Sequence, residues 1–62
     1  MEVKINTTNG IIVLQNVIDI DNYFIKDFTQ FVIEEKNGDF EIRQEIIRTS
    51  YIMSITIFSE DY

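Results

Sequence analysis

The side chains that could do chemistry in this sequence are mainly carboxylates, and four glutamates gather around the dipeptide Asn37-Gly38. Glu34, Glu35, Glu41 and Glu45 fall within a stretch of twelve residues. Carboxylates can act as an acid–base pair, as ligands of a hard cation, or as an anionic surface that attracts a basic protein. The composition of the chain and the spacing of its other polar residues bear on which of these uses applies.

Catalysis is disfavoured because the usual partners of a catalytic carboxylate or hydroxyl are missing. The chain has no His and no Cys, and proton transfer near neutral pH most often uses His. A serine nucleophile also needs a neighbouring base, so we expect Ser50, Ser54 and Ser59 to be structural. A pair of carboxylates could serve a glycosidase, but a chain of 62 residues offers little cleft for a sugar. We expect no enzymatic activity.

A metal site is also disfavoured. The stretch from Asp19 to Tyr23 resembles the start of a calcium loop, but the sixth position is Phe24 where a glycine is needed. The twelfth position is Gln30 instead of the required glutamate. An acidic helix start explains these residues better, so we expect neither a metal nor a cofactor.

Size and charge bound the partners. Sixty-two residues make one small domain spanning residues 1–62, without a disulfide or a zinc site to stabilise it, and such domains often self-associate. The formal charge is −6 and the five basic residues are scattered, which disfavours nucleic acid and anionic membranes as partners. Another protein with a basic surface, or a second copy of the chain in a homo-oligomer, fits better. The N-terminus lacks an apolar signal core, so we expect a cytoplasmic protein.

Two Asn-Gly dipeptides predict β-hairpins, because both residues readily adopt positive φ. Thirteen isoleucines and no alanine favour strands as well. The second hairpin has arms at 31–37 and 39–46, and a two-residue loop places Ile33 opposite Ile42 and Glu34 opposite Glu41. One face is then apolar, with Phe31, Ile33, Phe40 and Ile42. The other face is charged, with Glu34, Lys36, Asp39, Glu41, Arg43 and Glu45.

The first hairpin has expected strands at 2–8 and 11–17 around Asn9-Gly10. A two-residue loop at this dipeptide places Ile5 opposite Leu14. Its core face is expected to hold Val3, Ile5, Ile12 and Leu14. Ile11 and Val13 point the other way and could contribute to a subunit contact.

Between the hairpins we expect one short helix over 20–29, because Ile20, Phe24 and Phe28 recur every four residues after an acidic start. The alternative is that the second strand continues through Ile20. Residues 41–48 could form a strand or a helix. The pattern breaks around 48–51, where we expect a turn or a short 3₁₀ segment.

The last part of the chain is expected to be a strand at 52–58 that is interior or covered on both faces, followed by a flexible tail at 59–62. The predicted fold is therefore α+β: two β-hairpins plus a closing strand, with the short helix packed on the sheet. A small all-β SH3-like barrel is the alternative.

This order of elements, with the ending IRTSYIMSITI (residues 47–57), resembles small uncharacterised phage and prophage proteins of low-GC Gram-positive bacteria. The resemblance implies an accessory or host-directed protein that acts by binding, often as an oligomer. The last turn and strand are also similar to those of SH3-like and Sm-like barrels, but without the basic residues that bind RNA there.

We therefore expect a phage-encoded protein-binding module that inhibits or modulates a host protein through its acidic surface, with a self-assembling accessory protein as the alternative. The candidate contact residues are Glu34, Glu41, Glu45 and Tyr51.

Overall fold

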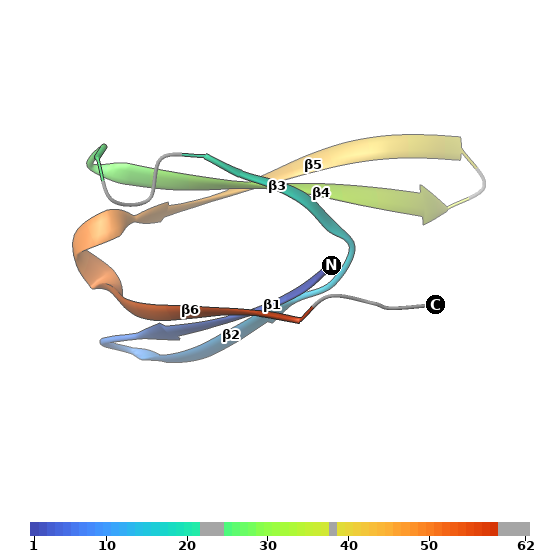
Figure 1. Cartoon of the computed structure of the whole chain (residues 1–62). Coiled ribbons are helices and arrows are strands. Elements are labelled where there is room, and N and C mark those ends of the chain that lie inside the picture. Colours follow the sequence, from blue (N-terminus) through green and yellow to red (C-terminus); the bar gives the residue numbers. More distant parts are fainter. Residues whose placement is uncertain (22–24, 38, 59–62) are drawn as a thin grey trace.

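The chain forms two antiparallel three-stranded sheets that face each other (Figure 1). The computed structural model describes residues 1–21, 25–37 and 39–58, with the backbone alone for 36, 37, 39 and 40. The elements in order are β1 (Glu2–Thr7), β2 (Gly10–Leu14), β3 (Val17–Asp21), β4 (Phe28–Asn37), β5 (Asp39–Arg48), the 3₁₀ turn η1 (Thr49–Tyr51) and β6 (Ile52–Phe58). The first sheet has the order β2-β1-β6 and the second β3-β4-β5.

The predicted α+β fold is wrong, because the described part of 20–29 is strand and turn. Ile20 lies in β3 opposite Phe31, and Phe28 lies in β4 opposite Arg48. A short helix has too few internal hydrogen bonds to be stable alone, whereas strand pairing connects these β-branched and aromatic residues directly to the core. The all-β alternative agrees with this strand content. Phe24, the middle residue of the expected helix, lies outside the described residues.

The first hairpin has a different loop from the expected one, and three of the four expected core residues are buried, whereas Ile12 is 38% exposed. Thr7 lies opposite Gly10 and Ile5 opposite Ile12, so the loop is Thr8-Asn9 and the register differs from the predicted one by two residues. The Thr7 hydroxyl holds this loop: it accepts a hydrogen bond from the backbone N–H of Asn9 at 3.1 Å and donates to the carbonyl of Gly10 at 2.8 Å. Because side chains alternate between the two faces of a strand, a register shift of two residues leaves every side chain on its predicted face.

A sharp bend at Asn16 carries the chain from the first sheet to the second. Asn16 has φ 61°, a left-handed conformation that asparagine tolerates better than most residues. Its carbonyl accepts a hydrogen bond from the backbone N–H of Glu34 at 3.0 Å. The bend thus ends β2 at Leu14, and Ile20 lies in the separate strand β3 of the other sheet. The alternative of one long second strand through Ile20 is therefore also wrong, although Ile20 does lie in a strand.

The β4–β5 hairpin differs from its predicted register by one residue. Ile33 lies opposite Arg43 and Glu34 opposite Ile42, whereas the predicted pairs were Ile33 with Ile42 and Glu34 with Glu41. A shift of one residue moves every side chain of one strand to the other face. Ile42 therefore lies on the outer face, where it is 57% exposed, and the predicted separation into an apolar and a charged face is wrong. The turn type at Asn37-Gly38 lies outside the described residues, as do the surroundings of the Phe40 side chain.

The core lies between the two sheets and is small. Its buried apolar side chains are Val3, Ile5, Leu14, Val17, Phe31 and Ile33. Thr29 is also buried, and its hydroxyl shares a 2.8 Å hydrogen bond with the hydroxyl of Thr49 in η1. Residues 41–48 are strand, and the turn or short 3₁₀ segment expected around 48–51 is a 3₁₀ turn over Thr49–Tyr51. The register of β4 with β5 is consistent with this core, because it directs the side chain of Ile47 in β5 toward the buried apolar residues.

The expectation that the last strand is interior or covered on both faces is wrong. Within the described residues β6 pairs with β1 alone. Met53 is 72% exposed and Ile57 52% exposed. β1 is the central strand of this sheet instead. The expected tail at 59–62 lies outside the described residues. In the part of the chain that is described, no helix has the length and apolar character needed to cross a membrane.

Candidate functional site

The far half of the β4–β5 hairpin is an acidic arm, which we define as residues 34–45. It contains five acidic and two basic residues and so carries half of the formal charge of the chain. Pairing with β3 ends at Ile33, and the last backbone contact to the bend is the hydrogen bond from Glu34 to Asn16. Beyond that point the described strands pair only with each other, and the hairpin extends past the bend between β2 and β3 (Figure 1).

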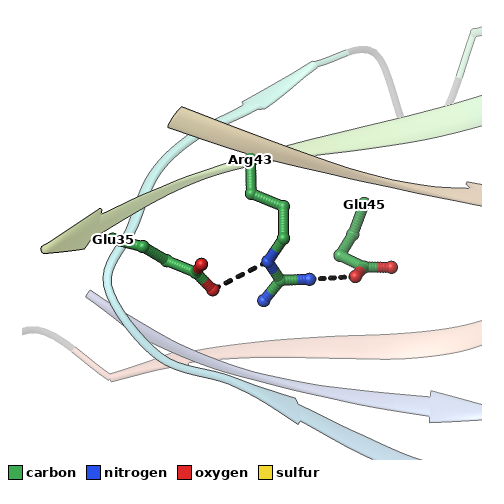
Figure 2. Close-up of polar contacts among 3 residues, drawn as sticks. All are labelled: Glu35, Arg43 and Glu45. Carbon is green, nitrogen blue, oxygen red and sulfur yellow. Dashed lines mark hydrogen bonds and ion pairs between the residues drawn. The ribbon is translucent and has the colours of Figure 1, made fainter. Parts of the chain in front are cut away.

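Arg43 joins two of the carboxylates of the arm. Its Nε donates to Glu35 Oε1 at 2.8 Å, and its Nη1 donates to Glu45 Oε1. Figure 2 shows these three side chains on the side of the hairpin that faces the other sheet. The pKa of Arg43 is raised above its usual value, first because the guanidinium donates to Glu35 and further because both carboxylates are negatively charged. All three side chains are about 40% exposed, so the pairs hold the geometry of the arm and add little stability.

The register separates the predicted contact residues. Glu34 lies on the outer face opposite Ile42, whereas Glu41 and Glu45 lie on the inner face with Arg43. Glu41 is exposed and lies opposite Glu35, so the arm does contain a like-charge pair, although not the predicted one. The arm therefore presents carboxylates from both of its sides.

Tyr51, the fourth predicted contact residue, lies at the opposite end of the molecule from the arm. It belongs to η1 and is 48% exposed. The guanidinium carbon of Arg48 is 5.9 Å from the centre of its ring and 5.6 Å from that of Phe28. Contacts of this kind between a cation and an aromatic face orient the arginine and are worth about 0.5–1 kcal/mol at exposed sites. Tyr51 is therefore grouped with Arg48, and not with the glutamates.

Sequence reasoning missed the apolar residues of the outer face. Phe28, Ile42 and Ile46 are each more than half exposed. A hollow of about 440 Å³ opens beside Phe28 and Ile46, and its lining also includes Asp21, Lys26 and Gln30. A second hollow of about 460 Å³ adjoins it at Lys26 and Phe28 and includes Arg48. The spacing of Ile42 and Ile46 put both on one face of β5, but only the register shows that this face is the outer one.

The described residues hold no cluster of three acidic side chains placed to bind a metal ion. Comparisons with protein-family models, curated proteins and solved structures find no match for this chain. Its function therefore has to be argued from its own surface.

Proposed function

We propose that this chain is a non-enzymatic protein-binding module whose acidic arm engages a basic surface on another protein. The observation that carries the proposal is the arm itself: a hairpin end that extends beyond the sheet supporting it and holds a net charge of −3 from residues 34–45. A projecting hairpin can approach a partner without a clash from the first sheet. Its charge speeds encounter with a basic partner and disfavours acidic ones.

The sequence resemblance to phage and prophage proteins suggests which kind of protein the partner is. We place the partner among the cytoplasmic proteins of a bacterial host, where a small acidic domain could inhibit or modulate a protein that normally binds a polyanion. The arm would then occupy the basic surface that such a protein offers to its usual ligand.

A pull-down from bacterial lysate tests the arm. Glu41→Lys reverses one exposed charge in the arm and should weaken capture of the partner severalfold, and raising the salt concentration should weaken capture by the unmodified chain. Asp27→Lys is the matched control, because Asp27 is also exposed and directly precedes β4, at the end of that strand far from the arm. Capture that is insensitive to salt, or that both variants weaken equally, would contradict a role for the arm.

A second candidate function is a self-assembling accessory protein, and one observation favours it. The chain exposes large apolar side chains on both sheets, including Ile11 at 62% and Ile46 at 58%. Contiguous exposed apolar surface is typical of sites that another protein surface covers. Sizing with light scattering tests this candidate, since a strict monomer at all accessible concentrations would exclude it.

A further inference from the structure

The outer face of the β4–β5 hairpin has uncharged residues at its centre and opposite charges at its two ends. Glu34 of β4 lies at one end and Arg48 of β5 at the other. Six residues separate the two positions along the ladder, which corresponds to about 20 Å. The residues between them on this face are Phe28, Gln30, Val32, Ile42, Gln44 and Ile46. Apolar and uncharged residues within a charged rim are the usual composition of a protein interface.

We propose that a second copy of this chain docks on this outer face, so that two β4–β5 hairpins pack face to face in a symmetric dimer. The proposal rests on the second candidate function above and specifies its surface. The arrangement of charges selects the symmetry. A two-fold axis that lies in the face and crosses the strands brings the Arg48 end of one copy over the Glu34 end of the other. An axis along the strands would place each Arg48 against its own counterpart, which is repulsive.

The shape of the face agrees with this orientation. The hollow beside Phe28 and Ile46 lies near the Arg48 end, and Ile42 lies near the Glu34 end. The same two-fold axis brings Ile42 of each copy to the hollow of the other. Ile42 is 57% exposed and would lose most of that contact with water. The pairing of Arg48 with Phe28 and Tyr51 holds its guanidinium in place at the rim.

The size of the face predicts a weak dimer. Eight side chains on two strands present on the order of 500 Å² per copy, compared with about 800 Å² in a standard stable interface. Asp19 lies on the outer face of the neighbouring strand β3. Its charge would face the acidic β3 of the other copy, so the contact should be confined to β4 and β5. We expect dissociation in the micromolar to millimolar range.

Sedimentation equilibrium over a series of concentrations tests the surface. The unmodified chain should show a monomer–dimer equilibrium, and Ile42→Lys should weaken it about a hundredfold, because each of the two symmetric sites loses about tenfold. Ile11→Lys is the matched control: Ile11 has a similar exposure of 62% but lies on the first sheet, so the dimer should persist. Circular dichroism should show that both variants are folded.

A charge exchange tests the orientation. Arg48→Glu and Glu34→Arg should each prevent dimerisation when alone, because each places like charges at both ends of the interface. An equimolar mixture of the two variants should form a dimer, because each end of the mixed pair then joins opposite charges. A chain with both substitutions should also recover the dimer. Glu34 and Arg48 are too far apart to pair within one chain, so recovery can come only from contact between copies.

Three results would overturn the proposal in different ways. A strict monomer at millimolar concentration would exclude both the dimer and the second candidate function. Self-association that Ile11→Lys abolishes, while Ile42→Lys does not, would leave self-assembly standing but move it to the first sheet. Dimers that Ile42→Lys dissociates but that the mixed variants fail to recover would exclude the two-fold axis described here.

Discussion

The hydrogen bond between Thr29 and Thr49 joins the start of β4 to the 3₁₀ turn that leads into the other sheet, and its two ends should respond unequally to mutation. Thr29 is completely buried, whereas Thr49 is only partly buried. The backbone N–H of Thr49 also donates to the carbonyl of Asp27 at 2.7 Å, which holds the turn in place. Removal of the Thr49 hydroxyl leaves the Thr29 hydroxyl in a buried site, whereas removal of the Thr29 hydroxyl leaves the Thr49 hydroxyl in a partly buried one.

Thr49→Val leaves the Thr29 hydroxyl buried without its partner and should lower the free energy of unfolding by about 2 kcal/mol. Thr29→Val instead replaces a buried hydroxyl by a methyl group, and water can reach the remaining Thr49 hydroxyl, so the loss should stay below about 0.5 kcal/mol. The unfolding entropy of a chain of 62 residues is roughly 130 cal/mol/K, so Thr49→Val should lower Tm by about 15 °C.

Urea unfolding followed by circular dichroism measures these differences. The double variant should be about as stable as Thr29→Val alone, which corresponds to a coupling of about 2 kcal/mol between the two sites. Thr56→Val, on the exposed side of β6, is the control and should change stability by less than about 0.5 kcal/mol. If Thr29→Val proves as costly as Thr49→Val, or if the two effects simply add, the account of this hydrogen bond is wrong.

Two further predictions test the register and the bend. Ile42→Lys, measured at low protein concentration, should change the free energy of unfolding by less than about 1 kcal/mol. Ile33→Lys should unfold the chain, because it buries a charge. A large loss of stability in Ile42→Lys would instead support the register in which Ile42 lies opposite Ile33. At the bend, Asn16→Gly should leave the free energy of unfolding unchanged within a few tenths of a kcal/mol. Asn16→Val should lower it by about 1–2 kcal/mol, because a β-branched residue resists positive φ. Equal urea midpoints for these two variants would argue against the left-handed bend.

The faces of the first hairpin could be predicted from the sequence because they do not depend on the exact loop. Val3, Ile5 and Leu14 are buried as expected, although the turn is two residues away from the expected position. The faces of the second hairpin could not be predicted in this way. Its register differs from the predicted one by a single residue, which moves every side chain of one strand to the other face. The Asn-Gly signal alone did not specify whether Ile42 or Ile47 of β5 would face the core.

The helix was the main error in the fold, and the reason is local. The i, i+4 spacing of Ile20, Phe24 and Phe28 is compatible with a helix, but it also places apolar residues on two separate strands with a turn between them. Local periodicity does not show that Ile20 has a partner at Phe31. Long-range pairing decided the structure of this segment. For the site, the clustering of acidic residues was visible in the sequence, but their division between two faces depended on the register.

The pairing of β1 with β6 has a consequence for the order of folding. Glu2 lies opposite Phe58, so the first sheet is complete only when residues 56 positions apart have met. The second sheet joins strands that follow one another along the chain, and closing a short loop loses less entropy than closing a long one. We therefore expect β3, β4 and β5 to form first and β6 to dock last, which is the slow step typical of non-local β pairing. Until that step the edge of β1 stays open, and this is the period in which the chain is most exposed to aggregation.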